Sequence, residues 1–193
     1  YVRKTDFNGN TLWINYLDTG PEVRQITTGN SLIKTQDGHY ALVGNRAKDI
    51  EGIDADFIFI KFTEYGQVLW KQTYGTTQEE KCYGIIETSD NGYFLYGYQY
   101  SGVTPSEFYC IKTNSLGVEE WSNTYSLEGS SVAFSAHETA DNGYIISGYG
   151  YHSSLNYQMY IVRTDNTGNQ LWERHYGTNN NDAGCNLSVT EHN

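Results

Sequence analysis

The sequence contains little of several features that would narrow its function at once. It has 2 prolines, 1 methionine and 3 cysteines in 193 residues, and its 12 lysines and arginines face 23 acidic residues. Binding to nucleic-acid phosphates needs clustered cations, so a net charge of −11 argues against a nucleic-acid partner. The apolar runs, such as residues 57–60, are much shorter than the about 20 residues of a membrane-spanning helix. We therefore expect no membrane span.

Motifs that bring chemistry are also scarce. The three cysteines, at positions 82, 110 and 185, lack C-x-x-C spacing, which argues against a zinc site or a disulfide framework. No serine-nucleophile, zinc-protease, phosphate-loop or dinucleotide motif occurs. The turn at residues 6–10 resembles a calcium loop but lacks the terminal glutamate. The neighbouring acids have the pattern of solvated surface residues: Glu79 with Glu80, Glu119 with Glu120, and Asp54 with Asp56. We expect no catalytic residues, no metal and no cofactor.

Tyrosine and glycine, in contrast, are abundant, with 18 and 20 copies. A G-x-x-x-W element repeats, first after 57 residues and then twice after 51, and it uses all 4 tryptophans of the chain. Its glycines are Gly9, Gly66, Gly117 and Gly168, and its tryptophans are Trp13, Trp70, Trp121 and Trp172. A residue present in every repeat is most simply structural, so we interpret these eight as structural.

Each repeat predicts the same strands and turns in the same order. A strand ending in a basic residue leads through the glycine turn to the tryptophan strand, and a third strand then leads through an Asp-Gly or Asn-Gly hairpin turn to a strand ending in glycine. Trp13 is followed by a tyrosine after three residues and the other tryptophans after four, which predicts a bulge or an altered edge in the first repeat. The approximate units are 1–57, 58–108, 109–159 and 160–193.

Four short antiparallel strands in about 50 residues are typical of a β-propeller blade. No segment shows a sustained helical period. We predict an all-β propeller, or a fragment of one, that forms a single domain over residues 1–193.

The blades resemble those of secreted or surface-exposed prokaryotic propellers that read D-x-x-G-x-x-x-W, then Y-G, then D-x-G-Y. The residues that carry this pattern include Asp165, Gly168, Trp172, Tyr176, Gly177, Asp141, Gly143, Tyr144 and Gly148. The G-x-x-x-W element is also similar to the tryptophan-docking motif of quinoprotein propellers, and the strand layout is similar to kelch blades. The resemblance implies that each indole packs between adjacent blades. It supplies no calcium ligands and no catalytic aspartate.

Ordered as in kelch blades, the strands give three complete blades and one split blade that lacks its second strand. The inner strand of the split blade is expected at residues 186–190. Three explanations remain open: the chain is part of a longer propeller, the fourth blade closes with three strands, or another chain donates the missing strand.

Residues on the expected inner strands differ between units, which makes them candidates for ligand binding in a central channel. They are Lys34, Glu87, Glu138 and His137. The basic column Lys4, Lys61, Lys112 and Arg163 is instead expected to make salt bridges to neighbouring blades. Loop tyrosines near positions 98–100 and 149–151 could stack on sugars or pack across strands.

We therefore expect a non-catalytic extracellular or cell-surface propeller that acts in binding or assembly, with a protein or glycan partner or with self-assembly through its open blade edges. The alternatives are a propeller enzyme that acts on carbohydrate or carries a quinone, and a structural spacer in a longer surface protein.

Overall fold

The computed structural model describes residues 1–17, 27–47, 55–103, 105–184 and 186–188. Within these ranges the secondary structure consists of β-strands, turns and coil, and no helix occurs. The predicted all-β class is therefore confirmed. The described part of the chain has no helix long and apolar enough to cross a membrane.

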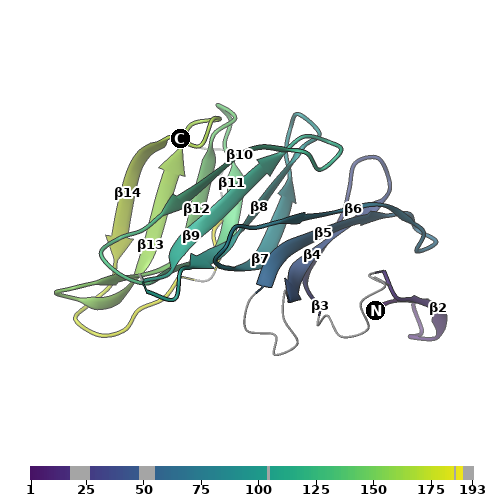
Figure 1. Ribbon diagram of the computed structural model, residues 1–193, viewed down its shortest axis with the longest axis horizontal. Coiled ribbons are helices and arrows are strands. Elements are labelled where there is room, and N and C mark those ends of the chain that lie inside the picture. The colour runs from purple at the N-terminus through teal and green to yellow at the C-terminus, as the bar shows by residue number, and fades with distance from the viewer. Residues whose placement is uncertain (18–26, 48–54, 104, 185, 189–193) are drawn as a thin grey trace.

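The strands form three four-stranded antiparallel sheets and one two-stranded sheet. Figure 1 shows these sheets following one another along the array in sequence order. The two-stranded sheet is the N-terminal hairpin, β1 (Val2–Thr5) and β2 (Thr11–Asn15). The three complete blades are β3 (Thr27–Lys34), β4 (Tyr40–Ala47), β5 (Ala55–Phe62) and β6 (Val68–Tyr74); then β7 (Glu79–Glu87), β8 (Tyr93–Tyr100), β9 (Glu107–Thr113) and β10 (Glu119–Tyr125); then β11 (Ser131–Glu138), β12 (Tyr144–His152), β13 (Asn156–Thr164) and β14 (Gln170–Tyr176).

In each complete blade the order of the strands across the sheet is their order along the chain. The blade therefore runs from the expected inner strand to the tryptophan strand, as the kelch-like ordering predicts. Figure 1 shows the hairpin β1–β2 at one end of the array and β14 at the opposite end. The sheets form an open, propeller-like array, and within the described residues the two ends of the chain lie apart and share no sheet.

The expected inner strand at residues 186–190 is not formed in its described part, because residues 186–188 have no strand conformation. Residues 189 and 190 lie outside the described residues. The backbone of Leu187 nevertheless contacts β11, since its N–H donates to Ser135 Oγ at 3.3 Å and its carbonyl oxygen lies 2.5 Å from His137 Nε2. Residues 186–188 therefore lie beside β11 but do not pair with any strand as part of a sheet.

The tyrosine spacing of the first repeat predicts a bulge or an altered edge, and the structure shows no bulge after Trp13 but a strand that ends early, at Asn15. Strand β2 pairs with β1 without interruption from Trp13 to Asn15, and Tyr16 lies outside the strand with 71% of its surface exposed. Leu17, four residues after Trp13, is buried against Ile58 and its neighbours. Leu17 therefore occupies the position that tyrosine has in the other blades.

The glycine turns have the conformation that their composition predicts. Gly168 has a φ of 82°, which a residue without a β-carbon adopts at little cost, and the Asp165 carboxylate accepts hydrogen bonds from the N–H groups of Thr167 and Asn169. These bonds and those from the Asn169 side chain lower the pKa of Asp165 to about 2. The turn is thus fixed by its own side chains.

Neighbouring blades meet where a tryptophan ring lies on the glycine turn of the following blade. A β-carbon added to Gly117 would lie 2.7 Å from the Trp70 ring, and one added to Gly168 would lie 2.7 Å from the Trp121 ring. The tyrosine four residues after each tryptophan donates its hydroxyl to the same turn, Tyr74 to Gly117 O at 2.6 Å and Tyr125 to Gly168 O at 2.7 Å. Each glycine is needed for close approach as well as for its φ.

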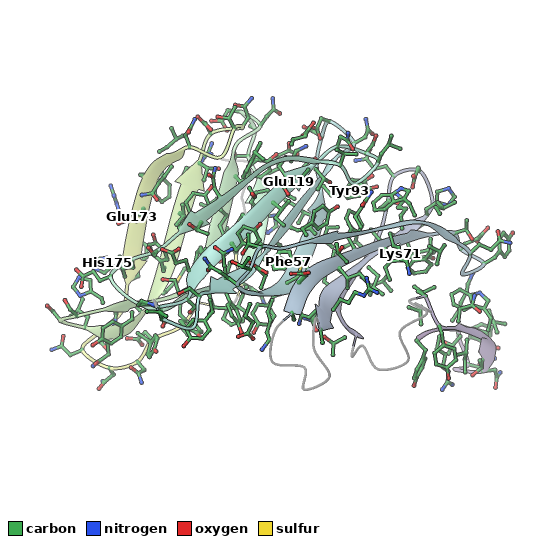
Figure 2. The ribbon with its side chains drawn as sticks, in the orientation of Figure 1. Phe57, Lys71, Tyr93, Glu119, Glu173 and His175 are labelled. Carbon is green, nitrogen blue, oxygen red and sulfur yellow. The ribbon has the colours of Figure 1, made fainter. Side chains whose placement is uncertain are left out.

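The hydrophobic core lies between the sheets. Phe57 packs edge-on against Tyr109 of the next blade, with 5.4 Å between ring centres, and Figure 2 shows Phe57 in the interior of the array. Phe94 stacks on Tyr144 across the following boundary at 4.2 Å. Each boundary between complete blades therefore buries a separate set of aromatic side chains.

Candidate functional site

The basic column forms ion pairs, but the partners of the buried members differ from the expectation of a neighbouring blade. Lys61 is 2% exposed and pairs with Asp37 of its own blade at 3.0 Å, while its bond to the next blade is to the Tyr93 hydroxyl at 2.5 Å. Burial opposes ionisation of Asp37, but hydrogen bonds from Thr35 and Lys61 outweigh it and lower the pKa of Asp37 to about 2.

The same arrangement recurs in the other complete blades. Lys112 pairs with Asp90 at 2.7 Å and with Glu120 at 3.0 Å, and Arg163 pairs with Asp141 at 2.5 Å. Each of these contacts lies within one blade, because the basic residue ends the third strand directly beside the turn that joins the first two. Among the four, Lys4 lies near an acid of the next blade, Glu64, at 3.9 Å.

Two of the expected channel residues link one blade to the preceding turn. Glu87 accepts a hydrogen bond from Gln36 N–H at 2.8 Å, and Glu138 accepts from Ser89 N–H at 2.7 Å and from Ser89 Oγ at 2.9 Å. These bonds occupy the carboxylates with the backbone of the neighbouring blade. That the two glutamates bind a ligand stays a prediction.

The other two channel candidates do not join them in one site. Lys34 is an exposed residue at the end of β3, and His137 contacts the backbone of Leu187. A hollow of about 540 Å³ beside Glu138 is lined by Ser89, Asp90, Lys112, Glu120, Trp121, Asn142, Tyr144 and Asn166, and by none of the other three candidates. The structure therefore distributes the four residues over three successive blades.

One acid that the sequence placed on the surface is buried. Glu80 is 0% exposed and accepts hydrogen bonds from Thr76 N–H at 3.1 Å, Thr76 Oγ1 at 2.6 Å and Gln99 Nε2 at 2.9 Å. In the last blade Asp182 binds Thr178 N–H and Oγ1 in the same way, at 2.6 and 2.9 Å. These carboxylates close the loop that follows the tryptophan strand.

The described cysteines, Cys82 and Cys110, are free and buried, as expected of small core residues. Burial raises the pKa of both thiols, so neither forms a thiolate nucleophile readily. Cys185 lies outside the described residues. Across the described ranges no group of three or more His, Cys, Asp or Glu side chains is placed to hold a metal ion.

Six aromatic side chains form a continuous row across the last two complete blades, which we call the aromatic row: Tyr98, Tyr83, Phe134, Tyr149, Tyr157 and Tyr151. Successive ring centres are 6.0, 5.2, 5.6, 5.3 and 5.5 Å apart. All six side chains are partly buried and partly exposed. The row therefore offers aromatic surface to solvent without a deep pocket.

Irregularities in the inner strands produce this row. The register of β7 shifts between Cys82 and Gly84, and that of β11 shifts between Ala133 and Ser135. Tyr83 and Phe134 are the extra residues at these bulges, which turn a side chain away from the regular alternation of a strand. Their rings meet across the blade boundary at 5.2 Å.

The equivalent positions of the first complete blade are polar. Asn30 lies at the bulge of β3 and donates its amide to Cys82 O at 2.6 Å, and Asn45 accepts from Cys82 N–H at 2.7 Å. The aromatic row is thus a place where the repeats differ. The sequence indicated the tyrosines at 98, 149 and 151, but they lie in strands β8 and β12 and not in loops. Tyr83, Phe134 and Tyr157 were not expected in this role.

These features define a class of protein, an all-β chain whose propeller-like blades carry a partly exposed aromatic row. Neither a family model nor a curated protein sequence matches the chain. It is similar to the crystal structure of a protein of unknown function from Bacteroides caccae, with a TM-score of 0.51 and 13% sequence identity. The match covers 89% of this chain and 52% of that one, so the chain spans about half the length of that structure. At this identity the likeness concerns the fold alone.

Proposed function

We propose that this chain is a non-catalytic, extracellular or cell-surface binding module that recognises a glycan along the aromatic row. The observation that carries the proposal is the unbroken contact of six partly exposed rings across two blades. The apolar C–H face of a sugar ring stacks on an aromatic ring, and tyrosine hydroxyls add hydrogen bonds at its edge. An extended surface of this kind suits a chain of sugars better than a single small molecule.

The charged residues around the row support recognition through neutral contacts. Lys81 pairs with Glu79 at 2.6 Å and lies 5.9 Å from the centre of the Tyr98 ring. This pairing leaves little free positive charge beside the rings, in a chain whose formal net charge is −11. A neutral glycan therefore fits the surface better than an acidic one.

The proposal of a non-catalytic role rests on how the acids are used. Glu87 and Glu138 bind the turns of neighbouring blades, and Glu80 closes a loop. Hydrolysis of a glycoside needs two carboxyl groups that flank one bond. Acids engaged with backbone N–H groups and hydroxyls serve the fold instead.

The test is isothermal titration calorimetry of the chain with a panel of soluble neutral and acidic polysaccharides. We expect saturable binding to a neutral glycan, and the double variant Tyr83→Ala, Phe134→Ala should bind it about 5-fold to about 150-fold more weakly, since two stacking contacts of ~0.5 to 1.5 kcal/mol each are lost. Tyr65→Ala removes an exposed tyrosine outside the row and is the matched control.

Two results would contradict the proposal. The first is that no glycan of the panel binds, or that the double variant binds as tightly as the unchanged chain. The second is the release of sugar fragments during the titration, which would show an enzyme acting on carbohydrate.

A further inference from the structure

The two ends of the array carry halves of one contact that the chain makes three times inside itself. Trp13, Trp70 and Trp121 each lie against the glycine turn of the following blade. Trp172 occupies the same repeat position in the last complete blade, and 39% of its surface is exposed. In the described part of the chain no glycine turn lies on Trp172.

The N-terminal hairpin shows the complementary situation. A β-carbon added to Gly9 would meet nothing within 4 Å, whereas one added to Gly66, Gly117 or Gly168 would meet a tryptophan ring. Phe7 on the same turn is 97% exposed. The turn at Gly9 has the conformation of the docked turns, with a φ of 84° against 79°, 74° and 82°.

We propose that the Gly9 turn of one copy of this chain docks on Trp172 of a second copy, so that the chains associate head to tail. The proposal goes beyond glycan recognition and does not depend on it. The hairpin β1–β2 and strand β14 lie at opposite ends of the array, so one copy can make both contacts with two different partners (Figure 1). An interface between two different surfaces is heterologous and leads to a ring or a filament.

The side chains around Trp172 match those of the contacts inside the chain. Tyr176 stands where Tyr74 and Tyr125 stand, and it is 56% exposed while those two are buried and donate to a glycine carbonyl oxygen. In the complex, Tyr176 would donate to Gly9 O, in place of the 3.3 Å bond that Gly9 O accepts from Arg3.

Arg174 adds a donor at the position of two asparagines that serve the same purpose. Asn15 donates its amide to Gly66 O at 3.0 Å, and Asn123 donates to Gly168 O at 3.1 Å. The guanidinium of Arg174 lies 5.8 Å from the centre of the Trp172 ring. Figure 2 shows its neighbours Glu173 and His175 on β14 at the outer end of the array, so this strand is open to a partner.

The last described residues, 186–188, would also take part in the contact between two copies. Residues 186–188 lie along β11, through the contacts of Leu187 with Ser135 and His137. In the chain, β7 takes the corresponding place beside β3, where Asn30 donates to Cys82 O. One copy would therefore supply the inner part of a shared blade and the second copy its two outer strands.

Two variants that each disable one half of the contact give a direct test. Trp172→Ala removes the ring, and Gly9→Asn keeps the turn, because asparagine adopts positive φ in this protein at Asn91, Asn142 and Asn156. Its side chain would occupy the space that the Trp172 ring takes in the complex. Gly38→Asn is the matched control, since Gly38 has a φ of 82° and open space around it.

Sedimentation velocity of the full chain from micromolar to millimolar concentration is the measurement. We expect the unchanged chain and Gly38→Asn to form species of at least twice the chain mass of 21.9 kDa, while Trp172→Ala and Gly9→Asn each stay at that mass. An equal mixture of these two variants should form a 1:1 dimer and nothing larger, because each contributes the half that the other lacks. Circular dichroism verifies that each variant is folded.

Three results would overturn the proposal: an unchanged chain that is monomeric at every concentration, association that survives both substitutions, or two monomeric variants that fail to pair when mixed. Any of them leaves the glycan titration unaffected, because the aromatic row and the Trp172 surface share no residue. The two proposals therefore fail independently.

Discussion

The inner boundary between the last two complete blades and the outer face of the last blade use the same repeat positions in different states. At the inner boundary Trp121 packs against Phe94, Tyr144 and the Gly168 turn, and its indole N–H donates to Asn166 O at 3.2 Å. At the outer face the equivalent Trp172 is 39% exposed. The same repeat position is thus packed between two blades in one place and partly exposed in the other.

The tryptophan and glycine of the repeat have different consequences for folding at inner boundaries and at the ends of the array. Where the next blade is present, tryptophan and glycine are needed for packing, and their replacement should weaken the fold. Where no blade covers them, the same residues should contribute little to folding. The first two predictions below compare an inner residue with its counterpart at an end, and the third tests an ion pair inside the array; they run from the largest expected effect to the smallest.

The largest difference is expected between two tryptophan variants. Trp121→Ala should lower the free energy of unfolding by ~3 to 5 kcal/mol, because it removes a large ring packed between two blades. Trp172→Ala should lower it by about 1 kcal/mol or less, since 39% of its surface is already exposed and no glycine turn of the described residues packs on it. Urea unfolding at a concentration where the chain is monomeric measures both, and equal losses would contradict the comparison.

A smaller difference is expected between two glycines of nearly identical backbone conformation. Gly168→Ala and Gly9→Ala place alanine at φ values of 82° and 84°, which costs each variant ~1 to 2 kcal/mol. Gly168→Ala should lose a further ~1 to 3 kcal/mol, because the new β-carbon would lie 2.7 Å from the Trp121 ring. The same melting temperature for both variants would show that the glycines serve the turn alone.

The smallest effect is a dependence on pH that comes from the Asp37–Lys61 ion pair inside the first complete blade. The pKa of Asp37 falls from 3.8 to about 2 on folding, so the stabilisation is complete above about pH 4 and is lost as the pH falls from 4 towards 2. Because the Asp37 side chain is 53% exposed, screening limits the effect to about 1 kcal/mol or less. Urea midpoints at several pH values should show a shallower acid limb for Asp37→Asn than for the unchanged chain. An identical acid limb would contradict the role given to the Lys61 pair.

The sequence predicted the parts of the fold that depend on residues repeated along the chain. The order of the four strands in a blade, the turns at Gly66, Gly117 and Gly168, and the three complete blades follow from columns of equivalent residues, which are visible when the repeats are aligned with one another. The alignment of Tyr16 with Tyr74 was wrong, because keeping the residue type is less important than burying an apolar side chain four positions after Trp13, where Leu17 lies.

The contacts between blades could not be predicted in the same way. Which backbone N–H group Glu87 or Glu138 reaches depends on the offset and twist between two sheets, and the sequence carries no direct signal for either. The burial of Glu80 could not be predicted either, because it depends on how the loop after the tryptophan strand folds back on the blade. The aromatic row depends on bulges at Tyr83 and Phe134, which no residue type indicates. The aligned repeats did carry one signal for the row: Asn30, Tyr83 and Phe134 occupy the same repeat position, and this position changes from polar to aromatic between blades.

The most direct test of the account is hydroxyl-radical footprinting of the four tryptophans in the monomeric chain, with each site quantified by mass spectrometry. The account predicts that Trp172 is oxidised faster than Trp70 and Trp121, because those two rings are covered by a glycine turn and by the aromatic side chains of the next blade. Oxidation of Trp121 at the same rate as Trp172 would contradict the claim that this repeat position is docked inside the array and open at its end.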